Sequence, residues 1–418
     1  MHEGFLFLQY LALILLGGKL AAEGFSRFGI SPVLGEIFAG FLLGPSCLGI
    51  VDLATGGESG AIVLGLAEVG ILFLMFTIGL ETRLGQIAQV GLLATAVAVG
   101  GVVLPLVLGY AVGVWMVPEE GWRVHLFIGA ITTATSVAIT ARVLRDLGIG
   151  RSRASRIILA AAILDDILGL VILSIVLAVG GTSSGHGAEG DQLPGAAAVL
   201  KSWLGIESNV LSTAAAMALF LVVLVPLLWR AVPRLLESMR KLESKGSLQV
   251  VASSLMLLVS YLADLCGLAP IVGAFLLGMI VGSSQVSRTI EEQTEAIFLL
   301  LAPVFFVSIG ITFEIGHLFS AWEFALVLTA AAVLSKGLGT GLPARLAGSS
   351  NREALLVGLG MIPRGEVGLI VANVGLAAGL LSQPVYAGSV AMCILTVLVI
   401  PPVLKLAAKD YGGAQVEE

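Results

Sequence analysis

The sequence predicts an all-α protein that crosses a membrane about thirteen times, and three observations carry this prediction. The first is composition, because 57% of the 418 residues are hydrophobic, only 12% are charged, and the mean hydropathy is +1.04. A soluble domain is about a quarter charged, so much of this surface must face lipid. The second observation is a series of long apolar stretches, and the third is an internal repeat rich in glycine and proline.

Thirteen apolar stretches are long enough to cross a bilayer as helices. They lie at 5–23, 30–49, 61–80, 89–116, 124–144, 156–180, 209–229, 247–266, 267–283, 296–312, 322–347, 354–379 and 385–406. The boundary at Gly267 is the least distinct. We expect one transmembrane unit over 1–418, with a flexible Gly- and Ser-rich outer loop at 181–208 and a short cytoplasmic tail at 407–418.

The distribution of Lys and Arg among the loops predicts the orientation. Seventeen of these residues fall on one side, and only Arg123 and Lys201 fall on the other. Because cytoplasmic loops are enriched in positive charge, the N-terminus is expected outside and the C-terminus in the cytoplasm. The N-terminus has no positive region before its first apolar stretch, which favours a retained helix over a cleaved signal peptide. We expect a multi-pass protein of the plasma (bacterial inner) membrane.

The internal repeat relates the segment from Gly29 to Gly44 to the segment from Gly267 to Gly282. Five Gly and Pro positions coincide at an offset of 238 residues, and Thr77-Ile-Gly79 is echoed by Ser308-Ile-Gly310. Glycine is common in membrane helices, but its general frequency does not readily account for five coinciding positions. Under the predicted orientation the two copies, 30–180 and 267–406, run in opposite directions. Inverted repeats are typical of secondary transporters, whose substrate site lies near the membrane midplane.

Adjacent carboxylates lie in the middle of the sixth apolar stretch, at Asp165 and Asp166. A charge at this depth costs about 2.5–3.5 kcal/mol on insertion scales, so such residues usually serve function. Adjacent helical residues point about 100° apart, and we therefore expect different partners for the two. Lys336, in the middle of the eleventh stretch, needs a carboxylate partner, and either aspartate could supply it. The alternatives are a purely structural buried pair and a lysine that reaches the membrane interface.

Two further segments are predicted to interrupt their helices. The fifth stretch contains a hydroxyl-rich run that includes Thr135 and Ser136 and can free carbonyl oxygens to bind a cation such as Na⁺. Polar contacts between helices are the alternative. The twelfth stretch contains Pro363, Arg364 and Glu366, and a broken helix in each repeat marks a binding region. Arg364 and Glu366 are expected to neutralise the half-helix dipoles rather than to contact the ion.

The remaining candidates carry little. The three cysteines have no metal-ligand spacing and are interpreted as small core residues. Glu36, Glu68 and Glu81 lie in or at the ends of early stretches. Glu36 is matched by Ala274 in the second repeat, and we assign it no ion role. No nucleotide-binding or nucleic-acid-binding motif is found, and no cofactor is expected beyond the transported ions.

Three motifs together resemble the monovalent cation:proton antiporter-2 family, and within it the NapA-type sodium/proton antiporters. They are Ala-Thr-Ser-Val-Ala-Ile-Thr-Ala-Arg at 134–142, Ile-Leu-Asp-Asp-Ile-Leu-Gly at 163–169, and Pro-Arg-Gly-Glu-Val-Gly at 363–368. The resemblance covers nearly the whole chain. It implies a thirteen-helix, NhaA/NapA-like fold with a core domain and a dimerisation domain, which works as a homodimer.

The resemblance also implies roles for individual residues. Asp166 matches the main ion-binding carboxylate, Asp165 matches the partner of the lysine at Lys336, and Thr135 and Ser136 lie beside the site. An Asp-Asp pair with this lysine resembles the electrogenic type. Many potassium-linked relatives carry a cytoplasmic nucleotide-binding domain, and its absence before Glu418 favours the sodium branch.

The resulting hypothesis is an electrogenic antiporter that exchanges cytoplasmic Na⁺ or Li⁺ for external protons. Competition between Na⁺ and protons for the same carboxylates, together with a rule that the empty charged site does not cross, is sufficient for exchange. Three alternatives remain open: a K⁺/H⁺ exchanger on the same fold, a sodium-coupled symporter for an organic anion, and a sensor that does not transport. The preference among Na⁺, Li⁺ and K⁺, the stoichiometry and the direction are not predicted.

Overall fold

The computed structural model describes residues 6–28, 30–53, 57–82, 84–136, 140, 143–144, 149–150, 152–180, 195–196, 198–199, 209–239 and 246–408. Within these ranges the chain is helical and contains no strand. The outer loop predicted at 181–208 and the tail predicted at 407–418 lie almost entirely outside the described residues.

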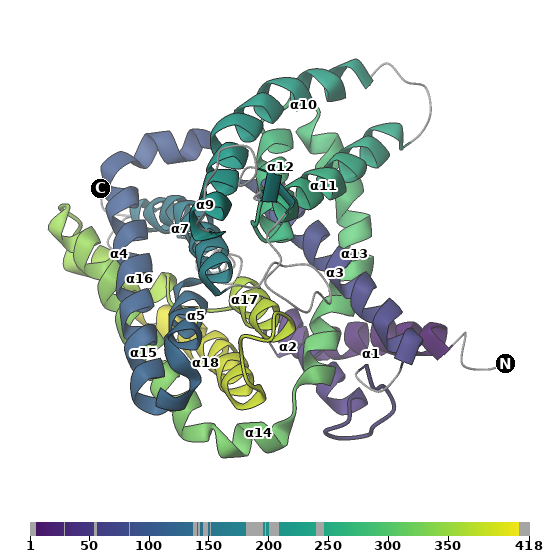
Figure 1. Ribbon diagram of the computed structural model, residues 1–418. Coiled ribbons are helices and arrows are strands. Elements are labelled where there is room, and N and C mark those ends of the chain that lie inside the picture. Colours follow the sequence, from purple (N-terminus) through teal and green to yellow (C-terminus); the bar gives the residue numbers. More distant parts are fainter. Residues whose placement is uncertain are drawn as a thin grey trace. The chain divides into compact units, whose positions relative to one another are not determined.

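The described chain contains both long helices and shorter ones (Figure 1). In chain order they are α1 Leu6–Arg27, α2 Pro32–Leu43, α3 Gly57–Glu81, α4 Leu84–Met116, the 3₁₀ turn η2 Pro118–Glu120, α5 Gly121–Thr133, α7 Arg153–Gly180, α9 Asn209–Leu219, the π-helical turn η3 Phe220–Leu224, α10 Val225–Met239, α11 Ser247–Leu265, α12 Pro270–Gly282, α13 Ser287–Thr312, α14 Ile315–Ser320, α15 Trp322–Leu346, α16 Asn351–Gly360, α17 Glu366–Ala377 and α18 Gln383–Ala408.

Among the described residues, nine helices are long and apolar enough to cross a membrane, and α2, α12 and α17 are shorter apolar helices. The all-helical membrane class is therefore confirmed, whereas the count of thirteen spans stays a prediction. The predicted boundary at Gly267 is present: this glycine has a φ of +83° between α11 and α12. Leu268 N donates to the carbonyl of Ala263 at 2.9 Å, which closes the end of α11.

Two helices extend beyond the apolar stretches that predicted them. The stretch 209–229 ends before Arg230, but α10 continues to Met239. The stretch 296–312 begins after Glu295, but α13 already starts at Ser287. Hydropathy marks only the part of a helix that suits lipid, and a helix can continue past it with polar side chains, because Arg and Glu are good helix formers.

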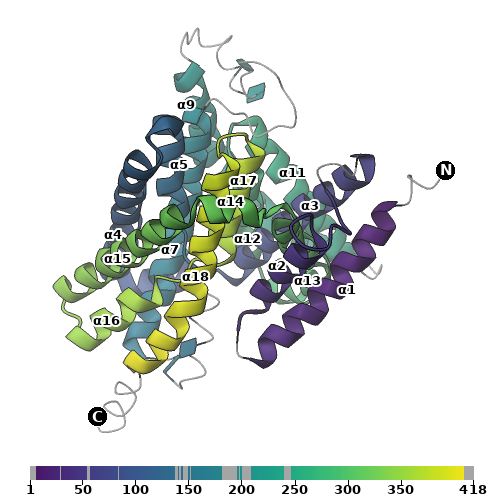
Figure 2. The same ribbon diagram turned by 90° about the horizontal axis from the view of Figure 1, so that it is seen from below.

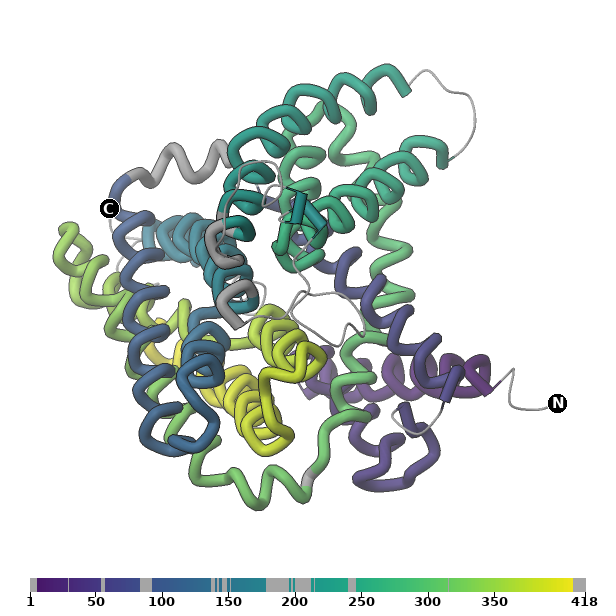
Figure 3. Tube along the Cα trace, viewed as in Figure 1, coloured from purple at the N-terminus to yellow at the C-terminus, as the bar shows by residue number. Residues whose placement is uncertain are grey.

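The chain divides into two compact units. Unit 1 comprises Met1–Ala21, Glu36–Leu84 and Ser174–Thr312, and unit 2 comprises Ala22–Gly35, Gly85–Leu173 and Phe313–Glu418. In unit 1, α3 packs against α12 and α13, and α11 packs against α12. Figure 3 follows the trace through α11, α12 and α13 in succession. These helices are unbroken along their described lengths.

Glycines allow the helices of unit 1 to touch backbone to backbone. A Cβ on Gly40 of α2 would lie 2.9 Å from the Cα of Gly310 in α13, and one on Gly278 of α12 would lie 2.9 Å from the Cα of Gly79 in α3. Such distances leave no room for any side chain at these positions. The described helices therefore meet at two glycine pairs, each of which joins residues far apart in the sequence.

Unit 2 contains α5 and α14 to α18 and most of α4 and α7. The helix α15 packs against α16 and α18, and α17 packs against α5 and α18 (Figure 2). Two pairs of glycines also bring helices close here: a Cβ on Gly109 of α4 would lie 2.8 Å from Gly129 Cα in α5, and one on Gly100 of α4 would overlap the carbonyl oxygen of Gly339 in α15. Unlike unit 1, this unit contains interrupted helices, and these interruptions position the candidate site.

Candidate functional site

The first interruption follows α5. This helix ends at Thr133, and Ala134, Thr135 and Ser136 have no helical structure, with Ala134 at φ −55° and ψ 146°. Thr132 Oγ1 donates to the carbonyl of Gly129 at 2.7 Å, and Thr133 Oγ1 donates to the carbonyl of Ala130 at 2.7 Å. Hydroxyls that bond to the preceding turn compete with the helix ladder, so this run of threonines weakens the end of α5.

The second interruption separates α16 from α17. The helix α16 ends at Gly360, residues 361–365 are not helical, and α17 begins at Glu366. Pro363 has no N–H to continue the ladder, and Gly365 adopts φ −96° and ψ −125° immediately before α17. The proline and glycine in the sequence thus act where we expected them to act.

The two interruptions are hydrogen-bonded to each other. Ser136 N donates to the carbonyl of Pro363 at 2.8 Å, and Thr140 Oγ1 donates to the carbonyl of Gly360 at 2.6 Å. Thr135 Oγ1 lies 3.4 Å from the carbonyl oxygen of Met361. Backbone groups that leave a helix inside a membrane need partners within the protein, and here each interruption supplies partners for the other.

A buried ion pair lies beside the first interruption. Lys336 Nζ of α15 is 2.6 Å from Asp165 Oδ1 of α7 and also donates to the carbonyl of Thr133 at 2.6 Å. The side chain of Lys336 is fully buried and that of Asp165 is 1% exposed. A Cβ on Gly101 of α4 would lie 2.6 Å from Thr340 Cγ2 and 3.5 Å from Lys336 Cε, so α4 passes close to α15 at the lysine.

Asp166 follows Asp165 in the chain but forms no ion pair with Lys336 in the described structure. Its Oδ1 atom and the Oδ2 atom of Asp165 are buried and have no hydrogen-bond partner among the described residues. The charges of Asp165, Glu366 and Lys336 all act on the Asp166 carboxyl, so the four groups are neighbours. Carboxylate oxygens without a partner, at this depth, are expected to bind a cation or a proton.

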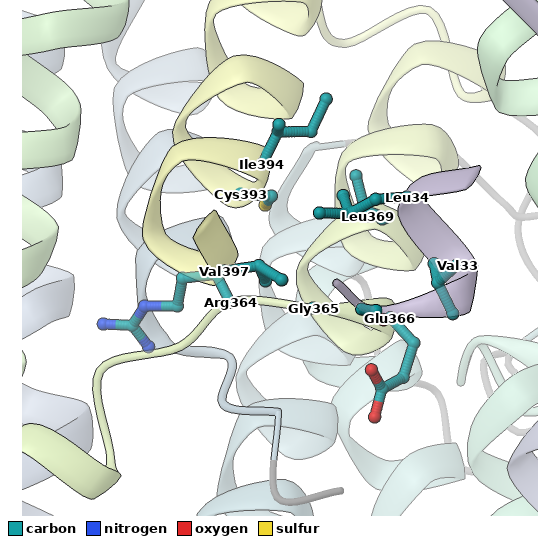
Figure 4. A pocket seen from close by; sticks show the side chains of 10 residues that line it. Val33, Leu34, Arg364, Gly365, Glu366, Leu369, Cys393, Ile394 and Val397 are labelled. Carbon is teal, nitrogen blue, oxygen red and sulfur yellow. The ribbon is translucent and has the colours of Figure 1, made fainter. Parts of the chain in front are cut away.

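Arg364 and Glu366 flank Gly365 and extend in different directions (Figure 4). The guanidinium of Arg364 is fully buried, and it donates through Nη1 to the carbonyl of Ala134 and through Nη2 to the carbonyl of Ala332 at 3.4 Å. Glu366 Oε2 accepts from Ser136 Oγ at 2.8 Å. Cations therefore lie at the carboxyl end of α5 and an acid lies at the amino end of α17, which is the arrangement that helix dipoles favour.

The five charged groups of the site give it an unbalanced charge. Two cations (Lys336 and Arg364) accompany three carboxyl groups (Asp165, Asp166 and Glu366), so the fully ionised set carries a net charge of −1. One monovalent cation or one proton neutralises it. Because an uncompensated charge is costly in lipid, this set is expected to bind one of them while Lys336 and Arg364 are both charged.

A small cavity lies on the other side of Gly365. It is lined mainly by apolar side chains at the start of α2 and along α17 and α18, and Cys393 contributes its thiol. The lining residues are Ser31, Val33, Leu34, Arg364, Gly365, Glu366, Leu369, Cys393, Ile394 and Val397 (Figure 4). The charged ends of Arg364 and Glu366 extend away from this apolar lining.

All the residues selected from the sequence therefore fall in unit 2: Thr135, Ser136, Asp165, Asp166, Lys336, Pro363, Arg364 and Glu366. Sequence reasoning missed Thr140, which was in view only as part of the hydroxyl-rich run, and Thr396, whose Oγ1 accepts from Arg364 N at 3.1 Å. It also missed the main-chain carbonyls that hold the two cations. A carbonyl leaves no mark in a sequence, and only the helix interruption indicates that one is free.

A membrane-spanning helical protein with paired helix interruptions and buried ionisable groups has the features of a secondary transporter. The chain belongs to the sodium/hydrogen exchanger family, whose transmembrane-region model matches residues 11–409. Members of this family are transporters and not enzymes.

Individual relatives cover almost the whole chain. It is 35% identical to the Na⁺/H⁺-K⁺ antiporter GerN of Bacillus cereus, over 97% of this chain and 98% of that protein. It is 31% identical to a Na⁺/H⁺ antiporter of Enterococcus hirae, over 96% of this chain and 98% of that protein. The structure of the sodium proton antiporter MjNhaP1 from Methanocaldococcus jannaschii at pH 8 matches with a TM-score of 0.70 at 18% identity, over 99% of this chain and 98% of that one. This last likeness concerns the fold.

Proposed function

We propose that the protein is an electrogenic antiporter that exchanges cytoplasmic Na⁺ or Li⁺ for external protons by alternating access. The observation that carries the proposal is the Lys336–Asp165 pair with Asp166 beside it, whose Oδ1 atom is buried and has no hydrogen-bond partner among the described residues. Asp166 is the main cation ligand. Thr135 and Ser136 line the site, and Pro363, Arg364 and Glu366 stabilise the helix interruptions.

The Lys336–Asp165 ion pair suggests how exchange is coupled, because a buried lysine that loses its carboxylate partner can release its proton. In the proton-loaded state Lys336 is protonated and paired with Asp165, and Asp166 holds a proton. Na⁺ binding expels the proton from Asp166, and Asp165 then turns from the lysine to the ion, which releases a second proton from Lys336. Two protons thus move for one Na⁺, so net charge crosses the membrane and the membrane potential drives sodium out.

The surroundings of the protein form part of the proposal. We propose a homodimer in the plasma membrane with the N-terminus outside and the C-terminus in the cytoplasm. The asymmetry of Lys and Arg supports this orientation. Two inverted repeats, 30–180 and 267–406, would build the transporter, and the crossed glycine pairs support this relationship: Gly40 and Gly278 are equivalent in the repeat, and each packs against a glycine of the other repeat's second helix.

The second candidate is K⁺/H⁺ exchange at the same site. The name of the 35%-identical relative GerN includes K⁺ as well as Na⁺, and this favours testing potassium directly. The buried charges would serve either cation, since carboxylate, hydroxyl and carbonyl oxygens bind both. The symporter and sensor alternatives have no comparable support.

The test is proton flux in proteoliposomes that contain a pH-sensitive dye, with Na⁺, Li⁺ or K⁺ added in turn. We expect Na⁺ and Li⁺ to move protons in the wild type and not in Asp166→Asn. Asn keeps the shape of the side chain but cannot carry the charge. A response to K⁺ alone would move the assignment to potassium, and silence with all three cations would overturn antiport. A membrane potential set across the vesicles should change the rate if the exchange is electrogenic.

A further inference from the structure

Glu36 is a buried acid outside the proposed ion site. It lies in α2, belongs to unit 1 and is only 9% exposed. Glu36, Gly40 and Gly44 are spaced by four residues, so they lie on one face of α2. The two glycines meet the backbone of α13 at Gly310 and Ile311. The carboxyl group therefore stands one turn before a tight helix contact, on the same face.

The surroundings of Glu36 are apolar. A Cβ on Gly18 of α1 would lie 3.9 Å from Glu36 Cγ, 2.8 Å from Val307 Cγ2 and 3.7 Å from Pro303 Cβ. The helices α1 and α13 thus close around the stem of this glutamate. Glu36 has no hydrogen-bond partner and no ion pair within 4.0 Å among the described residues. An ionised carboxylate in such a place is costly unless it takes up a proton or a partner.

One cation attracts the Glu36 carboxyl electrostatically without forming an ion pair with it. Lys19 of α1 follows Gly18 directly, is exposed, and exerts an electrostatic attraction on Glu36. No other charged residue occurs in α2, and the charged residues of α13 all lie between Arg288 and Glu295, before Pro303. Lys19 is therefore the cation that stabilises the ionised form.

The internal repeat shows that packing alone does not require an acid here. Gly278 and Gly282 of α12 are equivalent to Gly40 and Gly44, and they approach Gly79 and Leu80 of α3 just as Gly40 and Gly44 approach Gly310 and Ile311 of α13. The position equivalent to Glu36 is Ala274, which is fully buried. The equivalent contact between α12 and α3 forms with only the methyl group of Ala274 at this position. The tight helix contact therefore does not need the carboxyl of Glu36, and we look for a separate role for it.

We propose that Glu36 is a second proton-binding site, in the contact between α1, α2 and α13. Its protonated form lets the three helices close, and its ionised form draws the Lys19 ammonium inward and loosens the contact. The ligand is a proton and not a metal ion, because no cluster of three His, Cys, Asp or Glu side chains that could hold a metal ion is found among the described residues. This site would give the transporter a pH dependence separate from that of Asp165 and Asp166.

Infrared difference spectra between acidic and alkaline pH test the proton site directly, without any transport. The probe is the C=O stretch of a protonated carboxyl, measured in reconstituted protein. We expect one band to persist in a variant with Asp165→Asn and Asp166→Asn and to disappear in Glu36→Gln. If Glu36→Gln leaves the difference spectrum unchanged, Glu36 does not titrate and the proposal is wrong. Because this experiment needs no exchange activity, it stands or fails independently of the proposed function.

Transport then tests the consequence. We expect Glu36→Gln, which mimics the protonated form, to fold normally and to shift the midpoint of the pH profile of exchange by about one pH unit. Lys19→Gln should shift the midpoint in the same direction, since it removes the cation that favours ionisation. Glu23→Gln is the matched control, because Glu23 is an exposed acid on α1 that pairs with Arg27. A pH profile of Glu36→Gln that coincides with those of the wild type and the control would overturn the regulatory role.

Discussion

Units 1 and 2 both contain tight glycine contacts, but they differ in whether the helices around those contacts are continuous. In unit 1 unbroken helices meet at bare glycine pairs, Gly40 with Gly310 and Gly79 with Gly278. In unit 2 two helices are interrupted, and charged and hydroxyl side chains occupy the space that the interruptions open. Among the described residues, the buried Lys and Arg side chains belong to unit 2 alone.

The difference shows what a membrane requires of each arrangement. A continuous helix satisfies its own backbone, so close packing is all that it needs from its neighbour. An interrupted helix exposes carbonyls and N–H groups, and the protein must supply partners for them. In unit 2 these partners are Lys336, Arg364 and the hydroxyl of Thr140, and the N–H of Ser136 donates to the carbonyl of Pro363. The charged residues are therefore part of the structure as well as part of the chemistry.

The sharpest test of this dual role is Lys336→Gln, for which we expect the largest functional change. Exchange should persist at a reduced rate but lose its response to membrane potential, because the second proton has no carrier. Rates measured in proteoliposomes at set potentials provide the check, and Lys405→Gln, which alters an exposed lysine at the end of α18, is the control. A variant that remains fully electrogenic would show that Lys336 is only structural.

Removing Arg364 should cost the most stability. Arg364→Leu leaves the carbonyls of Ala134 and Ala332 without donors and leaves the three carboxyl groups with one cation. Breaking a buried charged contact of this kind costs about 3–5 kcal/mol. Thermal unfolding in detergent should show a large loss, whereas Arg123→Leu, which removes an exposed arginine, should unfold like the wild type. Equal stability of the two variants would contradict the capping role.

In unit 1 the corresponding test of stability is the addition of one methyl group at a glycine contact. Gly278→Ala places a Cβ 2.9 Å from Gly79 Cα, which the backbone cannot accommodate without a shift. We expect a loss of about 1–3 kcal/mol, typical of overpacking. Gly65→Ala in α3 is the matched control, because no heavy atom lies within 4 Å of the added Cβ, and it should be neutral or slightly stabilising. Similar unfolding temperatures for the two variants would refute the importance of the glycine pairs.

The smallest expected effect is that of Ser136→Ala. It removes one hydrogen bond to the Glu366 carboxyl, and the net contribution of a single hydrogen bond is about 0.5–1.5 kcal/mol. The half-saturating Na⁺ concentration should rise several-fold while the fold persists. Thr329→Ala removes a hydroxyl that bonds only to the preceding turn of α15 and serves as the control. An unchanged Na⁺ response in Ser136→Ala would exclude this hydroxyl from the site.

Much of the site could be predicted because the residues involved conflict with their surroundings. Asp165, Asp166 and Lys336 are charges in apolar stretches, and Pro363 is a helix breaker inside a span. The hydrogen-bond acceptors of Lys336 and Arg364 could not be predicted. The carbonyls of Thr133 and Ala134 are free to accept because α5 ends there, and their residue types do not indicate this. The same limit applies to Glu36, whose apolar surroundings come from α1 and α13 and not from its neighbours in sequence.

The end of α5 is held by two cations of different chemical character. Lys336 donates to the carbonyl of Thr133 and Arg364 donates to that of Ala134, one residue further on. Lysine can give up its proton when it is buried, but arginine stays charged at any physiological pH. The helix end therefore keeps a permanent donor even in the step where Lys336 is neutral. Under the proposed exchange, Lys336 can lose and regain its proton in each cycle while Arg364 keeps its hydrogen bond to the end of α5. The backbone at the interruption then does not have to rearrange in each cycle, which favours fast turnover.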